Sequence, residues 1–310
     1  MAAYQELYTS GQLEERVARA RAILSDCQLC PRSCRVDRLH GERGRCRTAA
    51  EPSVSSYGPH FGEEAPLVGL RGSGTIFFAH CNLRCMFCQN YSISQLGHGK
   101  VATTGEIAQM MLALQQRGCH NINLVTPTHV VPQIMEALYI AAGSGLSIPL
   151  VYNCGGYESV ETLKLLDGVI DIYMPDMKYY DELNGRRFSG VKDYPAVNRA
   201  AVKEMHRQVG DLLMDERGIA RRGLLIRHLV LPNGIAGTEG VVRFIADEIS
   251  SQTYVNIMAQ YYPAHRVLKI PVLSRPLYQE EFSEAVNLAR EHALERLDGM
   301  RPRSLAVKRG

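Results

Sequence analysis

Three cysteines after a predicted strand form the most informative pattern in this chain. The run 75–79 is rich in β-branched and aromatic residues, is entered through glycines, and predicts a buried strand. The cysteines follow with the spacing C-x3-C-x2-C: Cys81, Cys85 and Cys88. Such a loop can hold three corners of one iron–sulfur cluster and leaves a fourth iron without a protein ligand. Unrelated buried thiols or a zinc site are the alternatives, and zinc would need His80 or His98 as a fourth ligand.

Four cysteines near the N-terminus form a second predicted metal site. They have the spacing C-x2-C-x3-C-x11-C in a segment rich in glycine and arginine: Cys27, Cys30, Cys34 and Cys46. Four thiolates can hold a tetrahedral zinc ion, which would staple the segment, or a second iron–sulfur cluster, which would add an electron-transfer station. Spacing does not separate these alternatives, and ordinary reduced thiols are the third.

Composition limits the protein class. With 310 residues and 45% hydrophobic content, the chain can bury one large core and a small appendage. The net charge of +3 implies no general attraction to nucleic acid, and we interpret the basic tail at 301–309 as a solvated end. No apolar run is long enough to cross a membrane, and no signal peptide is evident. Because the cysteines cluster in metal-ligand spacings, we expect a reducing environment and a cytoplasmic protein.

After the three cysteines, strand and helix patterns alternate. Strands are predicted at 75–79, 121–126, 149–153, 170–174, 224–231 and 254–260, and helices between them at 104–117, 132–142, 160–166, 195–209 and 240–249. Repeated βα units with buried strands predict an α/β fold with a parallel sheet, and about six units suit a partial (β/α)6 barrel. A helix is predicted at 12–24 and a closing helix at 282–297. We therefore divide the chain into a metal-binding module (1–70), the barrel (71–275), and a C-terminal helix with its tail (276–310).

Polar residues lie past the carboxyl ends of the predicted strands, where barrel enzymes place their chemistry. Asp176 and Lys178 are two residues apart after the fourth strand, so their side chains point to the same side. They offer a carboxylate for an ammonium group and a cation for a carboxylate, which suits a zwitterionic ligand. Arg227 interrupts an apolar strand and, as a buried charge, needs either a ligand carboxylate or an acidic side chain.

The cysteine loop resembles that of the radical S-adenosylmethionine (SAM) superfamily, which carries C-x3-C-x-aromatic-C; Phe87 takes the aromatic position. The resemblance implies a partial (β/α)6 barrel and a [4Fe–4S] cluster whose open iron is chelated by the amino and carboxylate groups of SAM. The reduced cluster then cleaves SAM to a 5′-deoxyadenosyl radical, which abstracts hydrogen from a substrate. The cofactor carries that chemistry, while the protein holds, orients and shields it.

Other segments between about 72 and 265 resemble the pyruvate formate-lyase activating enzymes. The matching positions are Asn153 before two glycines, Asp176 and Lys178, Ser189-Gly190-Val191, Arg227, and His265, which aligns with a histidine that contacts the nucleoside of SAM. The superfamily's Gly-Gly-Glu is absent at the second strand end, where Thr126 and Thr128 offer hydroxyls and carbonyls instead. The cysteine-rich N-terminal module resembles that of a subgroup described as activating enzyme-like.

Several residues have a structural interpretation beside the chemical one. His129 can simply begin a helix, and His228 can be a satisfied core histidine. Cys154 could donate a hydrogen atom or ligate a metal, but a lone cysteine is more often a small buried hydrophobe. Within 54–69 we predict a loop or β-turn at 58–66. Its histidine and paired glutamates are expected in a surface turn that packs the small module against the main domain, rather than over the barrel mouth: His60, Glu63 and Glu64.

Three functions follow from these patterns. The first is a radical SAM enzyme that acts on a glycyl-radical protein. The second is a radical SAM enzyme that modifies a small molecule or another protein, with the N-terminal site as an auxiliary cluster or substrate clamp. The third is a non-catalytic iron–sulfur electron-transfer or metal-binding protein. Either enzyme would need an electron donor such as flavodoxin or ferredoxin, and cleavage of SAM separates both from the third hypothesis.

Overall fold

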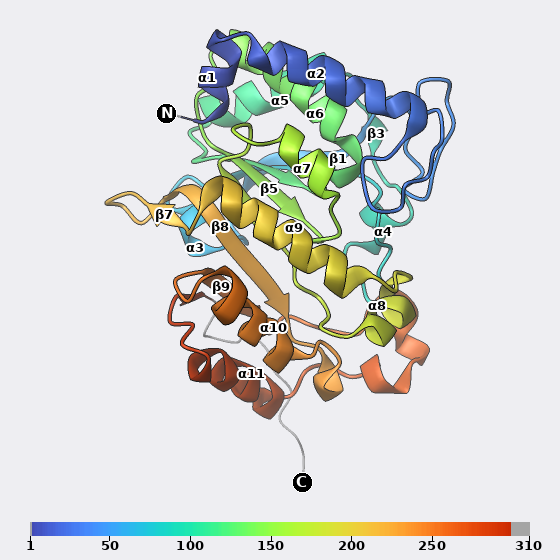
Figure 1. Ribbon diagram of the computed structural model, residues 1–310, viewed down its shortest axis with the longest axis vertical. Coiled ribbons are helices and arrows are strands. Elements are labelled where there is room, and N and C mark those ends of the chain that lie inside the picture. The colour runs from blue at the N-terminus through green and yellow to red at the C-terminus, as the bar shows by residue number, and fades with distance from the viewer. Residues whose placement is uncertain (1, 299–310) are drawn as a thin grey trace.

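The computed structural model describes residues 2–298, which form an α/β fold (Figure 1). The basic tail predicted at 301–309 lies outside the described residues. The described strands are β1 (Ser53–His60), β2 (Ser73–Phe78), β3 (Lys100–Val101), β4 (Ile122–Val125), β5 (Leu150–Cys154), β6 (Ile172–Pro175), β7 (Leu213–Met214), β8 (Ala220–Leu229), β9 (Tyr254–Met258) and β10 (Leu297–Asp298). All six predicted strands are therefore confirmed.

The strands form one largely parallel sheet. Their order is β10-β9-β8-β6-β5-β4-β2-β1-β3, with β7 beside β8. Every pair from β2 to β10 along this path is parallel, whereas β1 pairs antiparallel with both β2 and β3. The sheet thus brings the carboxyl ends of the six predicted strands to one edge.

Helices follow most of the parallel strands, as predicted. They are α1 (Tyr4–Thr9), α2 (Gln12–Ala22), α3 (Ala65–Val68), α4 (Tyr91–Ser94), α5 (Thr104–Gln116), α6 (Val131–Gly143), α7 (Val160–Leu165), α8 (Glu182–Ser189), α9 (Tyr194–Val209), α10 (Thr238–Phe244) and α11 (Gln279–Glu291). The helices α5, α6, α7, α9 and α10 occupy the five predicted intervals, and α2 occupies the predicted N-terminal helix. The closing helix, α11, starts earlier and ends earlier than predicted, because the chain returns to the sheet as β10. Within residues 2–298, no helix combines the length and apolar character needed to span a membrane.

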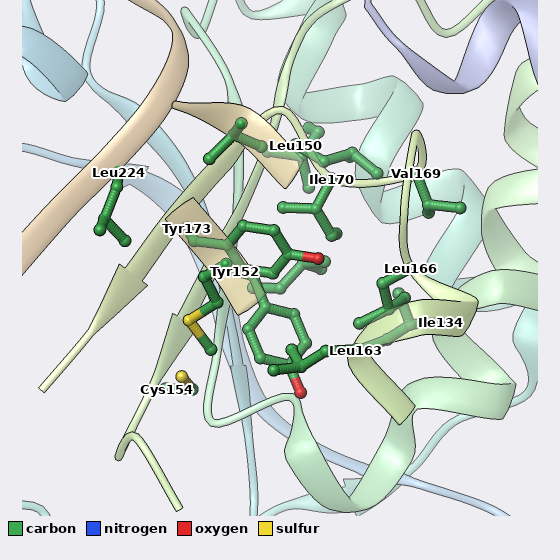
Figure 2. Close-up of a cluster of buried hydrophobic side chains, with 14 of the residues drawn as sticks. Ile134, Leu150, Tyr152, Cys154, Leu163, Leu166, Val169, Ile170, Tyr173 and Leu224 are labelled. Atoms are coloured by element: carbon green, nitrogen blue, oxygen red, sulfur yellow. The ribbon is translucent and has the colours of Figure 1, made fainter. Parts of the chain in front are cut away.

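The outer face of the sheet is apolar and is covered by helices. Figure 2 shows Tyr152 of β5 and Tyr173 of β6 packed among Leu163, Leu166 and other aliphatic side chains. The two tyrosine rings meet edge to face, 5.8 Å apart between centroids. Cys154 lies on the same face and is buried in this cluster, as expected for a small hydrophobe.

The inner face is covered by a segment for which the sequence predicted only a loop or turn. That prediction for 58–66 is wrong at both ends, because 58–60 belong to β1, which pairs with β2, and 65–66 begin α3, which packs Leu67 against Val151, Ile172 and Leu225. The sequence predicted a turn because β1 contains a glycine and a proline, which are typical of turns. However, β3 pairs only with the first residues of β1, so Pro59 lies along an exposed sheet edge, where proline is tolerated.

Glu158 is a carboxyl group buried beside the outer cluster. Its Oε1 accepts a hydrogen bond from the Thr128 hydroxyl at 2.8 Å, and its Oε2 accepts one from the Tyr152 hydroxyl at 2.9 Å. Burial raises the pKa of Glu158 to about 7, although hydrogen bonds from Thr128, Tyr152 and Cys154 oppose the shift. The group therefore titrates far from its ordinary range.

Replacing Glu158 by glutamine should flatten the dependence of stability on pH. Because folding raises the pKa above 4.5, the stabilisation from this group is complete below about pH 4.5 and is lost as the pH rises to about 7. A shift of this size corresponds to about 3 kcal/mol. Urea unfolding at several pH values measures it, with Glu161→Gln, an exposed change on α7, as control. Parallel profiles for wild type and E158Q would contradict this expectation.

Candidate functional site

The three-cysteine loop (81–88) follows β2 at the carboxyl edge of the parallel sheet. Phe87 packs against Tyr179 and Tyr261, with ring centroids 6.2 and 6.1 Å away. The Met86 N–H donates to the carbonyl of Phe188, at 2.7 Å. Segments that follow the later strands therefore hold the loop in place.

The three thiols interact with nearby donors and with one another. Burial raises the pKa of Cys81 to about 12, and the neighbouring Cys85 and Cys88 thiols contribute to the rise. The three thiols therefore lie close enough for their charges to interact, and as thiolates they could bind one cationic metal centre together. The closest polar contacts are Ser189 Oγ to Cys85 Sγ at 2.9 Å, Ser94 Oγ to Cys88 Sγ at 3.1 Å, and Leu83 N to Cys81 Sγ at 3.4 Å.

Asp176 and Lys178 form an ion pair beyond β6. Burial alone would lower the pKa of Lys178, but the Asp176 carboxylate and then the Cys85 thiol raise it well above its ordinary value. Burial raises the pKa of Cys85 in turn, while Lys178 and a hydrogen bond from Ser189 oppose that rise. The ion pair is therefore within electrostatic range of the three-cysteine loop.

Arg227 meets acidic side chains on the inner face. Its Nε and Nη2 donate to the two carboxylate oxygens of Glu64, at 2.6 Å each, and Nη2 also contacts Glu63. Asn256 donates to Glu64 at 2.7 Å, and Asn153 Oδ1 lies 3.4 Å from Nη1 of the arginine. Burial would raise the pKa of Glu64, but Arg227 holds it below its ordinary value. The acidic partner expected for this arginine is thus present.

The surface turn predicted for His60, Glu63 and Glu64 is wrong for the glutamates. The Glu64 residue is only 3% exposed, and the Glu63 side chain is 6% exposed. A buried arginine in β8 signals that a carboxylate must be near. The partner is missed because it lies 163 residues away in the chain, and Asn256, which supports it, is missed for the same reason.

Asn123 on β4 has a side-chain amide without a hydrogen-bond partner among the described residues. Both its Oδ1 and Nδ2 are buried, and neither has a partner among the described residues. The strand register pairs Asn123 with Val151 and Val125 with Asn153, so the two asparagines point to the same face. An unsatisfied buried amide costs free energy unless a ligand or water meets it. Asn123 and Asn153 therefore add two side-chain amides to the polar groups of this face.

The two predicted threonine ligands are placed differently. Thr126 has a φ of +59° and donates its N–H to Asn153 O at 2.8 Å, so it turns the chain at the end of β4. The Thr128 hydroxyl is bound to Glu158 on the outer side of the sheet. The Thr128 hydroxyl is therefore already engaged by a carboxyl group away from the inner face, and a cofactor contact of Thr128 stays a prediction.

His265 and His129 both lie beside cysteine-bearing segments. His265 stacks on Tyr91 at 4.7 Å and lies 3.3 Å from Gln95 Oε1. Gln95 Nε2 donates to the carbonyl of Cys85 at 2.6 Å, so the histidine connects to the three-cysteine loop through a residue that the sequence did not single out. His129 Nε2 lies 2.8 Å from Ala79 O, at the end of β2.

The four N-terminal cysteines line one cavity of about 10 Å³, which His129 and Arg38 also border. Burial raises the pKa of Cys30 to about 12; Cys46 and Cys27 add to the rise, and a backbone hydrogen bond opposes it. These thiols are therefore close enough for the charge of one to shift the pKa of another. The cavity joins residues up to 19 positions apart, as their metal-ligand spacing predicts.

Arg32 connects the two cysteine groups. This residue belongs to the N-terminal segment, yet it donates to three backbone carbonyls at the other site: Asn82 at 3.0 Å, Leu83 at 3.2 Å and Gly190 at 3.1 Å. No sequence pattern predicted this bridge, because its acceptors are backbone atoms. The N-terminal segment is thus fastened to the three-cysteine loop.

Within the described residues, no group of three or more His, Cys, Asp or Glu side chains has the geometry to hold a single metal ion. A cubane cluster spaces its thiolates farther apart than one ion does, so the thiols of the three-cysteine loop fit a cluster by number and chemistry. The metal of the N-terminal cysteines stays a prediction.

Replacing Arg227 by methionine should destabilise the protein strongly. The change leaves Glu64 buried without its cation, which costs about 3–5 kcal/mol. Arg221 is the matched control, because its pair with Asp215 is more exposed and R221M should cost much less than R227M. Urea unfolding measures both, and Glu64→Gln added to R227M should restore part of the loss. Equal losses in R227M and R221M would contradict this account.

Comparisons with known proteins agree with this geometry. The radical SAM superfamily model matches residues 75–211, which include the three-cysteine loop and the Asp176–Lys178 pair. The uncharacterized protein MJ0674 of Methanocaldococcus jannaschii is 34% identical over 292 residues, which cover 91% of this chain and 80% of that protein. The uncharacterized protein MJ0808 of the same organism is 24% identical over 288 residues, which cover 86% of this chain and 78% of that protein. The chain therefore belongs to the radical SAM superfamily, whose members bind SAM and an iron–sulfur cluster.

Proposed function

We propose that this radical SAM enzyme is an oxidoreductase that removes a hydrogen atom from a glycyl-radical protein. The observation that carries the proposal is the position of the Asp176–Lys178 pair beside the three-cysteine loop. The glycyl-radical part is supported by the sequence matches to activating enzymes at this pair and at Ser189-Gly190-Val191.

The residues present fit the cofactors of the superfamily. Cys81, Cys85 and Cys88 would hold a [4Fe–4S] cluster, which together with SAM supplies one-electron chemistry for hydrogen abstraction. Lys178 would donate to the carboxylate of the methionine part of SAM, and Asp176 would accept from its ammonium group. This arrangement replaces the missing Gly-Gly-Glu, since both charges are already fixed next to the loop.

Other side chains position the reactants and exclude water. Phe87 and its tyrosine neighbours close the apolar side of the loop. Asn123 and Asn153 present amides on the inner face, and Arg227 keeps Asn153 oriented. The stacked His265 offers an aromatic edge suited to a nucleoside. Each of these roles is binding or orientation rather than bond breaking.

A second function is favoured by the Arg32 bridge. A module fastened so closely to the catalytic loop could act as a substrate clamp or auxiliary cluster for a small molecule or a different protein substrate. In either case we propose an electron donor such as flavodoxin or ferredoxin. We also propose a reducing, cytoplasmic environment, because the cysteines cluster in metal-ligand spacings.

We further propose that the N-terminal cysteines bind a metal. These four thiols line one cavity, and four thiolates can hold either one zinc ion or a second iron–sulfur cluster.

Replacing Cys85 by alanine should abolish cleavage of SAM. We would reconstitute the protein without oxygen, reduce it, add SAM and a candidate glycyl-radical protein, and measure 5′-deoxyadenosine together with the glycyl radical by electron paramagnetic resonance. Cys119→Ala, a buried cysteine outside both groups, should retain both signals. SAM cleavage without a radical on the candidate would overturn the glycyl-radical proposal. A loaded cluster that never cleaves SAM would favour the electron carrier.

Metal analysis should find more metal per chain than the roughly four irons of one cluster, because the N-terminal thiolates add either one zinc or about four further irons. Cys30→Ala should remove this additional metal but leave about four irons, whereas C85A should lower the iron of the three-cysteine loop but leave the N-terminal metal, because different thiols hold them. About eight irons and no zinc would identify the N-terminal site as an auxiliary cluster, and about four irons with no other metal would contradict metal binding there.

A further inference from the structure

Five arginines surround a cavity of about 410 Å³ beside the three-cysteine loop. They come from separate parts of the chain: the N-terminal segment, the three-cysteine loop, α8, and the segment after β9. The guanidinium groups are those of Arg45, Arg47, Arg84, Arg187 and Arg266. Convergence of so many cations from distant segments is a product of the tertiary structure.

These arginines lack the partners that such groups usually have. In the part of the chain described here, none of the five forms an ion pair with a carboxylate, unlike Arg227, Arg221 or Arg275. Like charges held together cost free energy, and a bound anion would offset that cost.

We propose that this cavity binds a small molecule that carries clustered phosphate groups. The planar guanidinium fork matches the oxygens of phosphate and can bind them in pairs. Gly190, with a φ of +67°, adds backbone without a side chain to the wall. The nearest atom to a Cβ built there is Arg45 Nη2 at 3.9 Å, so the approach to the arginines is open.

The walls favour a small ligand over a protein partner. The volume lies within the range of small-molecule pockets, on the order of 300–1,000 Å³. Met86 is the single apolar side chain among the described residues that line it. The buried centre of a protein interface is normally apolar, so these walls suit oxyanions better than an acidic protein surface.

The ligand would lie between the two cysteine groups. Ser189, in the cavity wall, donates to Cys85 Sγ at 2.9 Å, and the N–H of Arg45 donates to Cys34 Sγ at 3.4 Å. A phosphate-bearing substrate or effector bound here would contact both cysteine-bearing segments. The proposal concerns binding alone and does not rest on the proposed reaction.

Isothermal titration calorimetry with tripolyphosphate tests the site on the anaerobically reconstituted full chain in low salt. We expect saturable binding that weakens as salt rises, because ion contacts are screened. Arg187→Ser and Arg266→Ser should each lower the affinity by about tenfold, the usual effect of losing one charge-assisted hydrogen bond. Arg217→Ser, which removes an exposed arginine away from the cavity, is the control.

Arg187→Lys and circular dichroism separate a lost contact from a damaged fold. The lysine variant should bind more tightly than R187S, and all variants should keep the wild-type spectrum. The proposal is overturned if tripolyphosphate does not bind. It is also overturned if the double variant R187S/R266S binds tripolyphosphate as tightly as the wild type does. It is also overturned if poly-aspartate binds through the same arginines more tightly than tripolyphosphate, since that result would identify an acidic protein partner.

Discussion

The two hydrogen bonds between Arg227 and the carboxylate of Glu64 fix the inner face of this protein. Burying both charges carries a large desolvation cost, which is offset only because the geometry is bidentate and further side chains complete it. Asn256 holds the carboxylate and Asn153 approaches the guanidinium. The network therefore joins the α3 segment to β5, β8 and β9 and presents a defined polar surface to any ligand at the strand ends.

The parallel sheet supplies the second constraint. Its outer face is buried beneath helices, and its carboxyl edge gathers the three-cysteine loop and the Asp176–Lys178 pair, which come from strands that are not neighbours. The outer face is thus apolar, whereas the inner face carries polar side chains as well as the apolar cluster around Leu67. Alternation along β5 illustrates this, since Tyr152 packs outward and Asn153 points inward.

The N-terminal segment is part of the same assembly. Arg32 binds the backbone around the three-cysteine loop, and Arg45 and Arg47 join arginines of the radical SAM domain around one cavity. The relative MJ0674 aligns over 292 residues, well beyond the 75–211 of the domain match. A function for this protein must therefore account for both cysteine groups and the charged cavity beside them.

The sequence by itself determined the features that depend on local pattern. Apolar periodicity predicted every parallel strand from β2 to β9 and the helices between them, and cysteine spacing with Phe87 predicted the superfamily. The Asp176–Lys178 pair was also predictable, because side chains two residues apart, just past the end of a predicted strand, are expected on the same side. The tertiary structure alone decided the contacts that join distant segments. Glu64 with Arg227, the Arg32 bridge and the five-arginine cavity depend on how the chain folds back on itself, and no local spacing records that path. It also decided the partner of the Thr128 hydroxyl, a buried glutamate that lies 30 residues away in the chain.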